Sequence, residues 1–193
     1  MNKILIGEIG MKKSVLWLVE TALMLAMLVA LQAVTKPMGQ LVTGSCVNLI
    51  LAITVLVVGC SGGLTVALLS PVFAFLLNIA PNIVTVIPIM VGNAAFVVLL
   101  KLLYNKALWQ QILALAAAAA AKFALLYFLV VKVICEFLAP ELLMKKIGDT
   151  IILAPKMTKM LPTMFSWTQL FTALIGGAVA LLIYPTLKKA LRK

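Results

Sequence analysis

The stretch ALAAAAAAKFALLYFLVV, residues 114–131, is an apolar run interrupted by a single charged residue, Lys122. It lies within a longer apolar segment, 109–135, which has the length that a helix needs to cross a bilayer, about 20 residues. A cation near the middle of such a helix is costly and marks a candidate functional position. The fold therefore depends on whether the rest of the chain also belongs in a membrane.

The composition places the whole chain in a bilayer. Of its 193 residues, 65% are hydrophobic and only 11% are charged. Soluble domains are closer to half apolar and a quarter charged, and a soluble protein of this size would expose large apolar patches. We therefore predict an all-α integral membrane bundle that forms one domain over residues 1–193, with lipid around it.

Six apolar segments are predicted to span the membrane. Clusters of Pro, Gly and polar residues separate these segments. The first segment contains Glu20 and lacks a good cleavage site, so we predict a retained helix and not a signal peptide. A long loop, 136–164, precedes the last helix, and PELLMKKIG at 140–148 could form a short surface helix within it. The predicted helices are 14–34, 46–59, 62–79, 84–103, 109–135 and 165–186.

Lysine and arginine counts predict the orientation. With six helices both termini lie on one side, and that side carries Lys3, Lys12, Lys13, Lys101, Lys106, Lys188, Lys189, Arg192 and Lys193. The other side has Lys36 and four lysines of the 136–164 loop, which three acidic residues balance. Positive residues accumulate in cytoplasmic loops. We expect cytoplasmic termini and outward-facing loops at 35–45, 80–83 and 136–164.

Composition also argues against several kinds of site. The chain has no histidine, and its three cysteines lack CxxC spacing, so no metal site and no cofactor are expected. The net charge of +11 follows from the loop lysines, so no nucleic-acid partner is expected. No pair of acidic residues lies at mid-depth, so general acid–base chemistry has few candidates and we do not expect an enzyme.

Polar residues inside the predicted helices gather at mid-depth or toward the outside. This asymmetry predicts a cavity that opens outward and is closed below. Each residue also has a plain structural interpretation: an amide can simply bond a neighbouring helix, and Trp167 can anchor at the interface. The candidate solute-binding residues are Gln32, Asn48, Asn78, Asn93, Lys122, Tyr127, Trp167 and Gln169.

Lys122 is the strongest candidate because it lies too far from either end of its helix to reach water easily. Gln111, Lys122 and Glu136 fall on one stripe at helical period, which we expect to face inward. The structural alternative is a pair with Glu20 or with backbone carbonyls, and depth argues against Glu20. An ammonium here would suit a carboxylate, phosphate or carbonyl on a solute.

Helix 14–34 carries a ladder of small residues, Ala22, Ala26 and Ala30, spaced four residues apart on one face. Small residues at this spacing let helices approach closely in a membrane. Packing within the bundle is one explanation of the ladder, and an interface with a membrane partner is the other.

Several stretches carry a family resemblance: ALMLA at 22–26, VNLILAITVLVVGCSGGLTVALLSPVFAFL at 47–76, PIMVGNAAFVVL at 88–99 and FSWTQLFTALIGGAVALLI at 165–183. Together with the size, the predicted helices and the long outer loop, they resemble the substrate-binding S component of energy-coupling factor (ECF) vitamin transporters. ALMLA resembles the AxxxA motif of that family.

The resemblance implies a function in the prokaryotic plasma membrane. An S component binds a vitamin or related micronutrient from outside, docks on a membrane T component driven by two cytoplasmic ATPases, and topples to release its solute inside. Ala22 and Ala26 would then face the T component, and the loops 35–45 and 136–164 would cap the cavity. The chain has no GxxxxGK[ST] sequence, so we do not expect it to hydrolyse ATP itself.

Other classes of function stay open from the sequence. A self-sufficient small secondary transporter or channel is the main alternative, although such proteins usually carry intramembrane acids for ion coupling and only Glu20 lies near a span. A membrane enzyme is a weaker alternative, because the chain has no histidine and no pair of acidic residues at mid-depth. A structural subunit without a ligand is also weaker, because polar residues gather at mid-depth and toward the outside.

Overall fold

The computed structural model describes the backbone of residues 2–105, 107–143, 146–147, 150–151 and 153–191, and side chains within 13–105, 107–139 and 153–191. Apart from one two-residue β pairing, the described elements are helical. In chain order they are α1 (Asn2–Thr35), η1 (Lys36–Met38), α2 (Gln40–Val57), α3 (Cys60–Leu76), η2 (Ile83–Thr85), α4 (Val86–Leu103), α5 (Leu108–Leu126), the π-helix η3 (Tyr127–Leu143), β1 (Lys146–Ile147), β2 (Thr150–Ile151), α6 (Pro155–Phe165) and α7 (Trp167–Ala190).

Five described helical segments are long and apolar enough to cross a membrane: Lys13–Met38, Gln40–Val57, Ile83–Leu103, Leu108–Ala139 and Trp167–Ala190. The chain is therefore a multi-pass membrane protein. The remaining predicted span corresponds to α3, which is apolar but only 17 residues long. At 1.5 Å per residue, α3 measures about 26 Å, somewhat less than a hydrocarbon core of about 30 Å.

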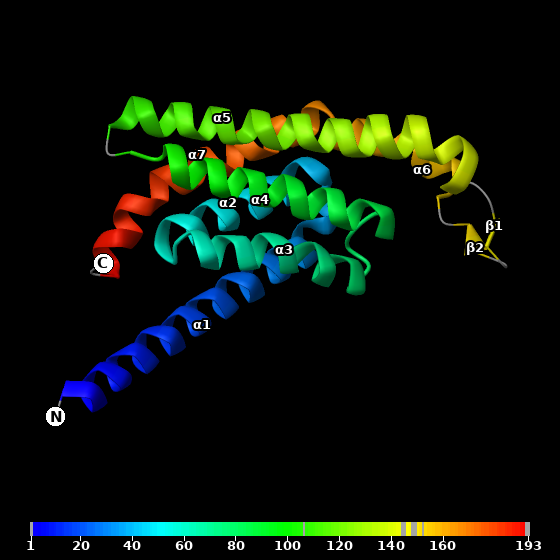
Figure 1. Cartoon of the computed structure of the whole chain (residues 1–193). Helices are drawn as coiled ribbons and strands as arrows, with labels where there is room; N and C mark the ends of the chain where they lie inside the picture. Colours follow the sequence, from blue (N-terminus) through cyan, green and yellow to red (C-terminus); the bar gives the residue numbers. More distant parts are fainter. Residues whose placement is uncertain (1, 106, 144–145, 148–149, 152, 192–193) are drawn as a thin grey trace.

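Most of the helices run in roughly one direction and form a bundle (Figure 1). The two termini lie at one end of this bundle, and the β1–β2 hairpin and α6 lie toward the other end. The N-terminal half of α1 extends away from the remaining helices. Only 11% of the apolar window of α1 is buried, compared with 61% of the window of α2.

Helix α2 is at the centre of the packing, because it contacts α1, α3, α4 and α7. Its sequence is apolar on nearly every face, as expected for a helix enclosed by others. Leu51, Ala52 and Val55 are fully buried in the main core. A second, smaller core joins η3 to α6 and includes Phe165 and Leu161.

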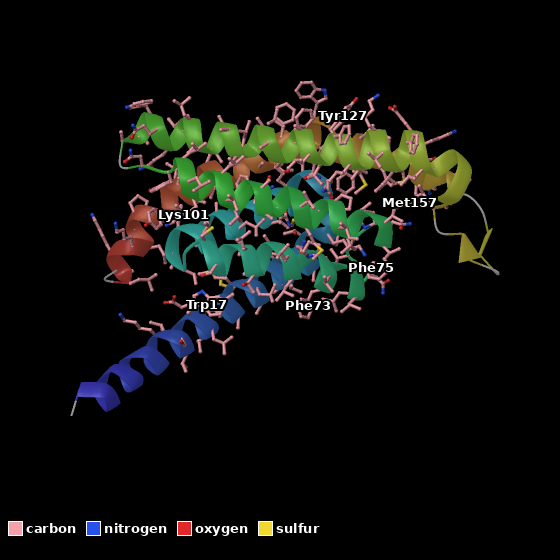
Figure 2. The ribbon with its side chains drawn as sticks, in the orientation of Figure 1. Trp17, Phe73, Phe75, Lys101, Tyr127 and Met157 are labelled. Carbon is pink, nitrogen blue, oxygen red and sulfur yellow. The ribbon has the colours of Figure 1, made fainter. Side chains whose placement is uncertain are left out.

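The outside of the bundle is strongly apolar. Leu182 is 78% exposed and Leu102 is 73% exposed. Figure 2 shows the side chains of Tyr127 and Phe73 at opposite edges of the bundle. Large apolar side chains distributed over the surface in this way are stable in lipid and would be unstable in water.

Two glycines make the connections on either side of α2 possible. Gly39, with φ of +89°, joins η1 to α2, and Gly59, with φ of +104°, joins α2 to α3. These backbone conformations are strained for any residue that has a Cβ atom. They allow α2 to begin at Gln40, so most of the predicted loop 35–45 is in fact helix.

The predicted long loop 136–164 is wrong in its details. The fifth transmembrane segment continues as η3 to Leu143, and the two short strands and α6 fill most of the remainder. The surface helix considered for 140–148 is also not seen: residues 140–143 end η3 and 146–147 form β1, while 144–145 and 148 lie outside the described residues. Pro140 and Pro162 lie within helices, although proline usually breaks a helix.

The predicted inward stripe of the fifth helix is correct only up to its middle. Leu115, Ala118 and Lys122 are buried, but Glu136 is exposed and pairs with Lys132 at 2.8 Å. The reason is the change from α to π geometry at Tyr127. A π-helix bonds residue i to i+5 and takes more residues per turn, so a stripe drawn at 3.6 residues per turn loses its phase.

Candidate substrate-binding site

A cavity of about 80 Å³ lies among the helices of the bundle. Its enclosed volume is smaller than the usual range of small-molecule sites, roughly 300–1,000 Å³. Residues of all seven α-helices, α1 to α7, contribute to its wall. The lining residues are Gln32, Gln40, Thr43, Gly44, Val47, Asn48, Pro71, Ala74, Ile79, Ala80, Pro81, Ile89, Asn93, Lys122, Met164, Phe165 and Gln169.

Lys122 is the charged group of this cavity and is only 2% exposed. Its Nζ donates hydrogen bonds to Asn48 Oδ1 at 2.6 Å and to Asn93 Oδ1 at 2.7 Å. The ammonium also lies 5.7 Å from the centre of the Phe96 ring. The Lys122 side chain therefore joins α5 to α2 and α4. These two hydrogen bonds go to neutral side-chain amides, and not to the carboxylate or backbone carbonyls considered as its structural partners.

The Asn48 amide is held on both sides. Its Nδ2 donates to the backbone oxygen of Gly44 at 2.8 Å and to Thr172 Oγ1 at 3.4 Å, while its Oδ1 accepts from Lys122. This fixes which atom of the amide faces the ammonium. The position of Asn48 thus depends on close packing of α2 against α7.

Two other lining polar groups have unused hydrogen-bonding capacity. Within the described side chains, Asn93 Nδ2 and Gln32 Oε1 are buried and have no hydrogen-bond partner. Buried polar atoms normally find a partner, so an unpaired one inside a cavity indicates a place for a ligand or water. Gln169, by contrast, donates from Nε2 to the backbone oxygen of Met164 at 3.0 Å.

The structure brings together five of the eight predicted binding residues and leaves three away from the cavity. Gln32, Asn48, Asn93, Lys122 and Gln169 line it. Their contact with a solute stays a prediction, because the cavity shows only that they surround one space.

Asn78, Tyr127 and Trp167 do not line this cavity. Trp167 is 63% exposed and stacks on Phe123 with ring centres 5.3 Å apart, and Tyr127 lies 5.9 Å from the same ring. Asn78 lies in the turn after α3, where its backbone oxygen accepts from Lys36 Nζ. The predictions for these residues rested on depth alone, and depth does not say which way a side chain faces.

Sequence reasoning missed Gln40 and Thr43, which line the cavity from α2. Both fall in the segment predicted as a loop. If the predicted helix 46–59 is extended by about one and a half turns toward its N-terminus, positions 40, 43, 44, 47 and 48 fall on one face at helical spacing. This spacing is the sequence signal that identifies Gln40 and Thr43.

The alanine ladder lies away from the cavity. Ala22, Ala26 and Ala30 are exposed on α1, whereas Thr21 and Leu28 on the same helix are buried. Packing against the described part of the chain therefore does not explain the ladder. The face of α1 that carries the ladder is accessible from outside the bundle.

Comparison with known proteins gives one match. A family model described as "ECF transporter, substrate-specific component" matches residues 20–188. No curated protein and no solved structure matches the chain. The matched region includes α2 to α6, nearly all of α7 and slightly less than half of α1, and therefore every residue that lines the cavity.

Proposed function

Because the chain belongs to the family of substrate-specific components of ECF transporters, we propose that it captures a vitamin or related micronutrient outside the cell and delivers it to an energising module. Members of this family are transporter subunits and not enzymes. In this proposal the whole chain acts as one transmembrane domain whose task is to bind the solute. The energy for uptake comes from elsewhere in the complex.

The cavity around Lys122 is the observation that carries the proposal. It combines a buried ammonium, neutral amides on α1, α2, α4 and α7, and apolar walls from residues such as Val47 and Ile89. A mostly apolar pocket with a few convergent polar groups is the usual form of a small-molecule site. The unpaired Asn93 Nδ2 and Gln32 Oε1 supply polar contacts that a bound solute would complete.

The proposed partners are a membrane T component and two cytoplasmic ATPases. The sequence contains no GxxxxGK[ST] phosphate-binding motif, which supports a subunit that relies on other subunits for ATP hydrolysis. The exposed ladder of Ala22, Ala26 and Ala30 supports α1 as the contact with the T component, because small residues permit close helix approach in lipid.

The proposed location is the plasma membrane of a prokaryote, with both termini in the cytoplasm. The end of the bundle that carries both termini (Figure 1) also carries Lys101 (Figure 2) and the last turn of α7, which contains Lys188 and Lys189. Positive residues favour the cytoplasmic side. The cavity lined by Gln40 and Pro81 then opens toward the outside, near the ends of α2 and α3 that lie farthest from the termini.

Two measurements test this function. The purified protein should retain a small solute without ATP, which mass spectrometry of the released ligand detects. Uptake of that solute into proteoliposomes should then require both the energising module and ATP. A self-sufficient transporter or channel would instead move the solute when this chain alone is reconstituted, and that result would reject the proposal.

A further inference from the structure

Resting on the proposed function, we infer that the solute is a small carboxylate with an apolar body and a hydrogen-bond donor at its other end. The carboxylate binds Lys122 and Asn93, and the distal donor binds Gln32. The inference follows from the charge of the cavity, the unused donors beside that charge and the unpaired acceptor elsewhere in the wall.

The charge of the cavity selects an anion. Lys122 is a basic residue, and none of the described residues that line the cavity is acidic. Its two hydrogen-bond partners, Asn48 and Asn93, are neutral amides, so they solvate the ammonium without neutralising it. A buried charge without a counterion is unfavourable, and an entering anion removes this cost, whereas an entering cation increases it.

The geometry around the ammonium suits a carboxylate in particular. An ammonium has three N–H donors, and Lys122 uses two of them on amide oxygens. Asn93 Oδ1 lies 2.7 Å from Nζ, so the Nδ2 atom of the same amide lies next to the ammonium, and it has no partner of its own. Two adjacent donors match the two oxygens of one carboxylate. A phosphate dianion would leave one negative charge without a cation among the described lining residues.

The remainder of the lining describes the rest of the solute. Val47, Ile89 and Phe165 supply apolar contacts, which suit a hydrocarbon or ring without further charge. Gln32 is on the last turn of α1, and its unpaired Oε1 is an acceptor that needs an N–H or O–H group. The solute is therefore polar at both ends, anionic at one and a donor at the other.

Matched pairs of acids and neutral derivatives test the inference on the unmodified protein. The probes are biotin and biotinamide, lipoate and lipoamide, pantothenate and panthenol, and nicotinate and nicotinamide, with thiamine as a cation and pyridoxal 5′-phosphate as a phosphate. Binding is measured by thermal shift and by titration in detergent. We expect at least one acid to bind, and its neutral partner to bind about 30-fold more weakly or worse, because a lost charge pair in a buried site has this magnitude.

Lys122→Met tests the residue, and Lys132→Met is its control. Lys132 is on the same transmembrane segment but is exposed and paired with Glu136. We expect Lys122→Met to weaken binding of the acid by about 30-fold or more, and Lys132→Met to change it by less than about 3-fold. Gln32→Met should weaken binding only of those acids that carry a distal donor. If Lys122→Met does not fold, Lys122→Arg, which keeps the charge, should still prefer the acid over its neutral partner.

The outcomes separate this inference from the proposed function. A protein that retains or binds a neutral, cationic or phosphorylated solute in preference to every acid keeps the proposed function and overturns the inference. Equal effects of Lys122→Met and Lys132→Met also overturn it. A protein that retains no solute through purification and binds none of the probes fails the proposed function, and the inference fails with it.

Discussion

Gly176 on α7 is the position where a single methyl group should disturb both the fold and the site. A Cβ atom added there would lie 2.2 Å from the backbone oxygen of Ser45, 2.8 Å from the backbone nitrogen of Leu49 and 2.9 Å from Asn48 Cβ. Ordinary contacts begin at 3.4 Å. Because two of these neighbours are backbone atoms of α2, no side-chain rotation can relieve the overlap, and α2 and α7 must separate by roughly 1 Å.

The neighbouring Gly177 is the matched control. A Cβ atom there would also be too close to its neighbour, at 2.1 Å, but that neighbour is Cδ1 of the flexible Leu115 side chain. Both Gly→Ala changes gain roughly 1 kcal/mol of helix propensity. Overpacking against a rigid backbone should cost about 3 kcal/mol or more, at the upper end of the usual range, and against a side chain about 1 kcal/mol. We therefore expect Gly176→Ala to lose about 2 kcal/mol net and Gly177→Ala to be nearly neutral.

Thermal unfolding in detergent, followed by fluorescence-detected size exclusion, measures the difference. At roughly 2–4 °C per kcal/mol for a chain of this size, Gly176→Ala should lower the Tm by about 4–8 °C and Gly177→Ala by less than about 2 °C. Gly176→Ala should also weaken solute binding about 10-fold, because it moves Asn48 away from Thr172 and from the ammonium of Lys122. A Gly176→Ala protein as stable as Gly177→Ala would refute the claim that the α2–α7 contact is backbone-limited.

Two further predictions concern residues outside the cavity. Ala22→Trp or Ala26→Trp should abolish uptake by the full complex. Either variant should change solute binding by less than about 3-fold, because both residues are exposed and lie away from the cavity. The control Ala120→Trp, on the exposed face of α5, should leave uptake intact. Comparison of uptake and binding assays checks this, and loss of binding would mean that the ladder packs internally. Trp167→Ala should likewise change binding by less than about 3-fold, since Trp167 is exposed and stacked on Phe123. A large loss in a titration would restore Trp167 to the site.

The membrane fold and the central residues of the site could be predicted from the sequence for simple physical reasons. Apolar runs of sufficient length identify helices in lipid, and a lysine inside such a run cannot be left in contact with lipid. The same argument holds for Asn93 at mid-depth, but not for Asn48 and Gln169, which lie nearer the outer ends of their helices, where an interfacial position is also possible. Lys122 and Asn93 therefore had to face the bundle interior, whatever the exact packing.

The remaining features depend on information that polarity and depth do not contain. Trp167 and Tyr127 are amphipathic and stable on an outer surface, so their depth did not fix the direction in which they face. The π geometry beyond Tyr127 moved Glu136 away from the predicted stripe, and no simple sequence period signals that change. The sequence predicts the start of α2 too late, because Gly and Ser are typical of loops, whereas Gly44 and Ser45 lie in the helix at its close contact with Gly176 and Thr172.

The weak attachment of α1 has a consequence for the role of the lipids. Residues 13–35 form the apolar part of α1 and measure about 35 Å, against a hydrocarbon core of about 30 Å. A helix in this situation tilts, and the tilt changes with the thickness of the bilayer. Little of α1 is buried against the bundle, so most of its surface faces lipid and is sensitive to this thickness. The thickness of the surrounding membrane therefore contributes to the angle at which the alanine ladder is presented, together with any contact that Gln32 on the same helix makes with a bound solute.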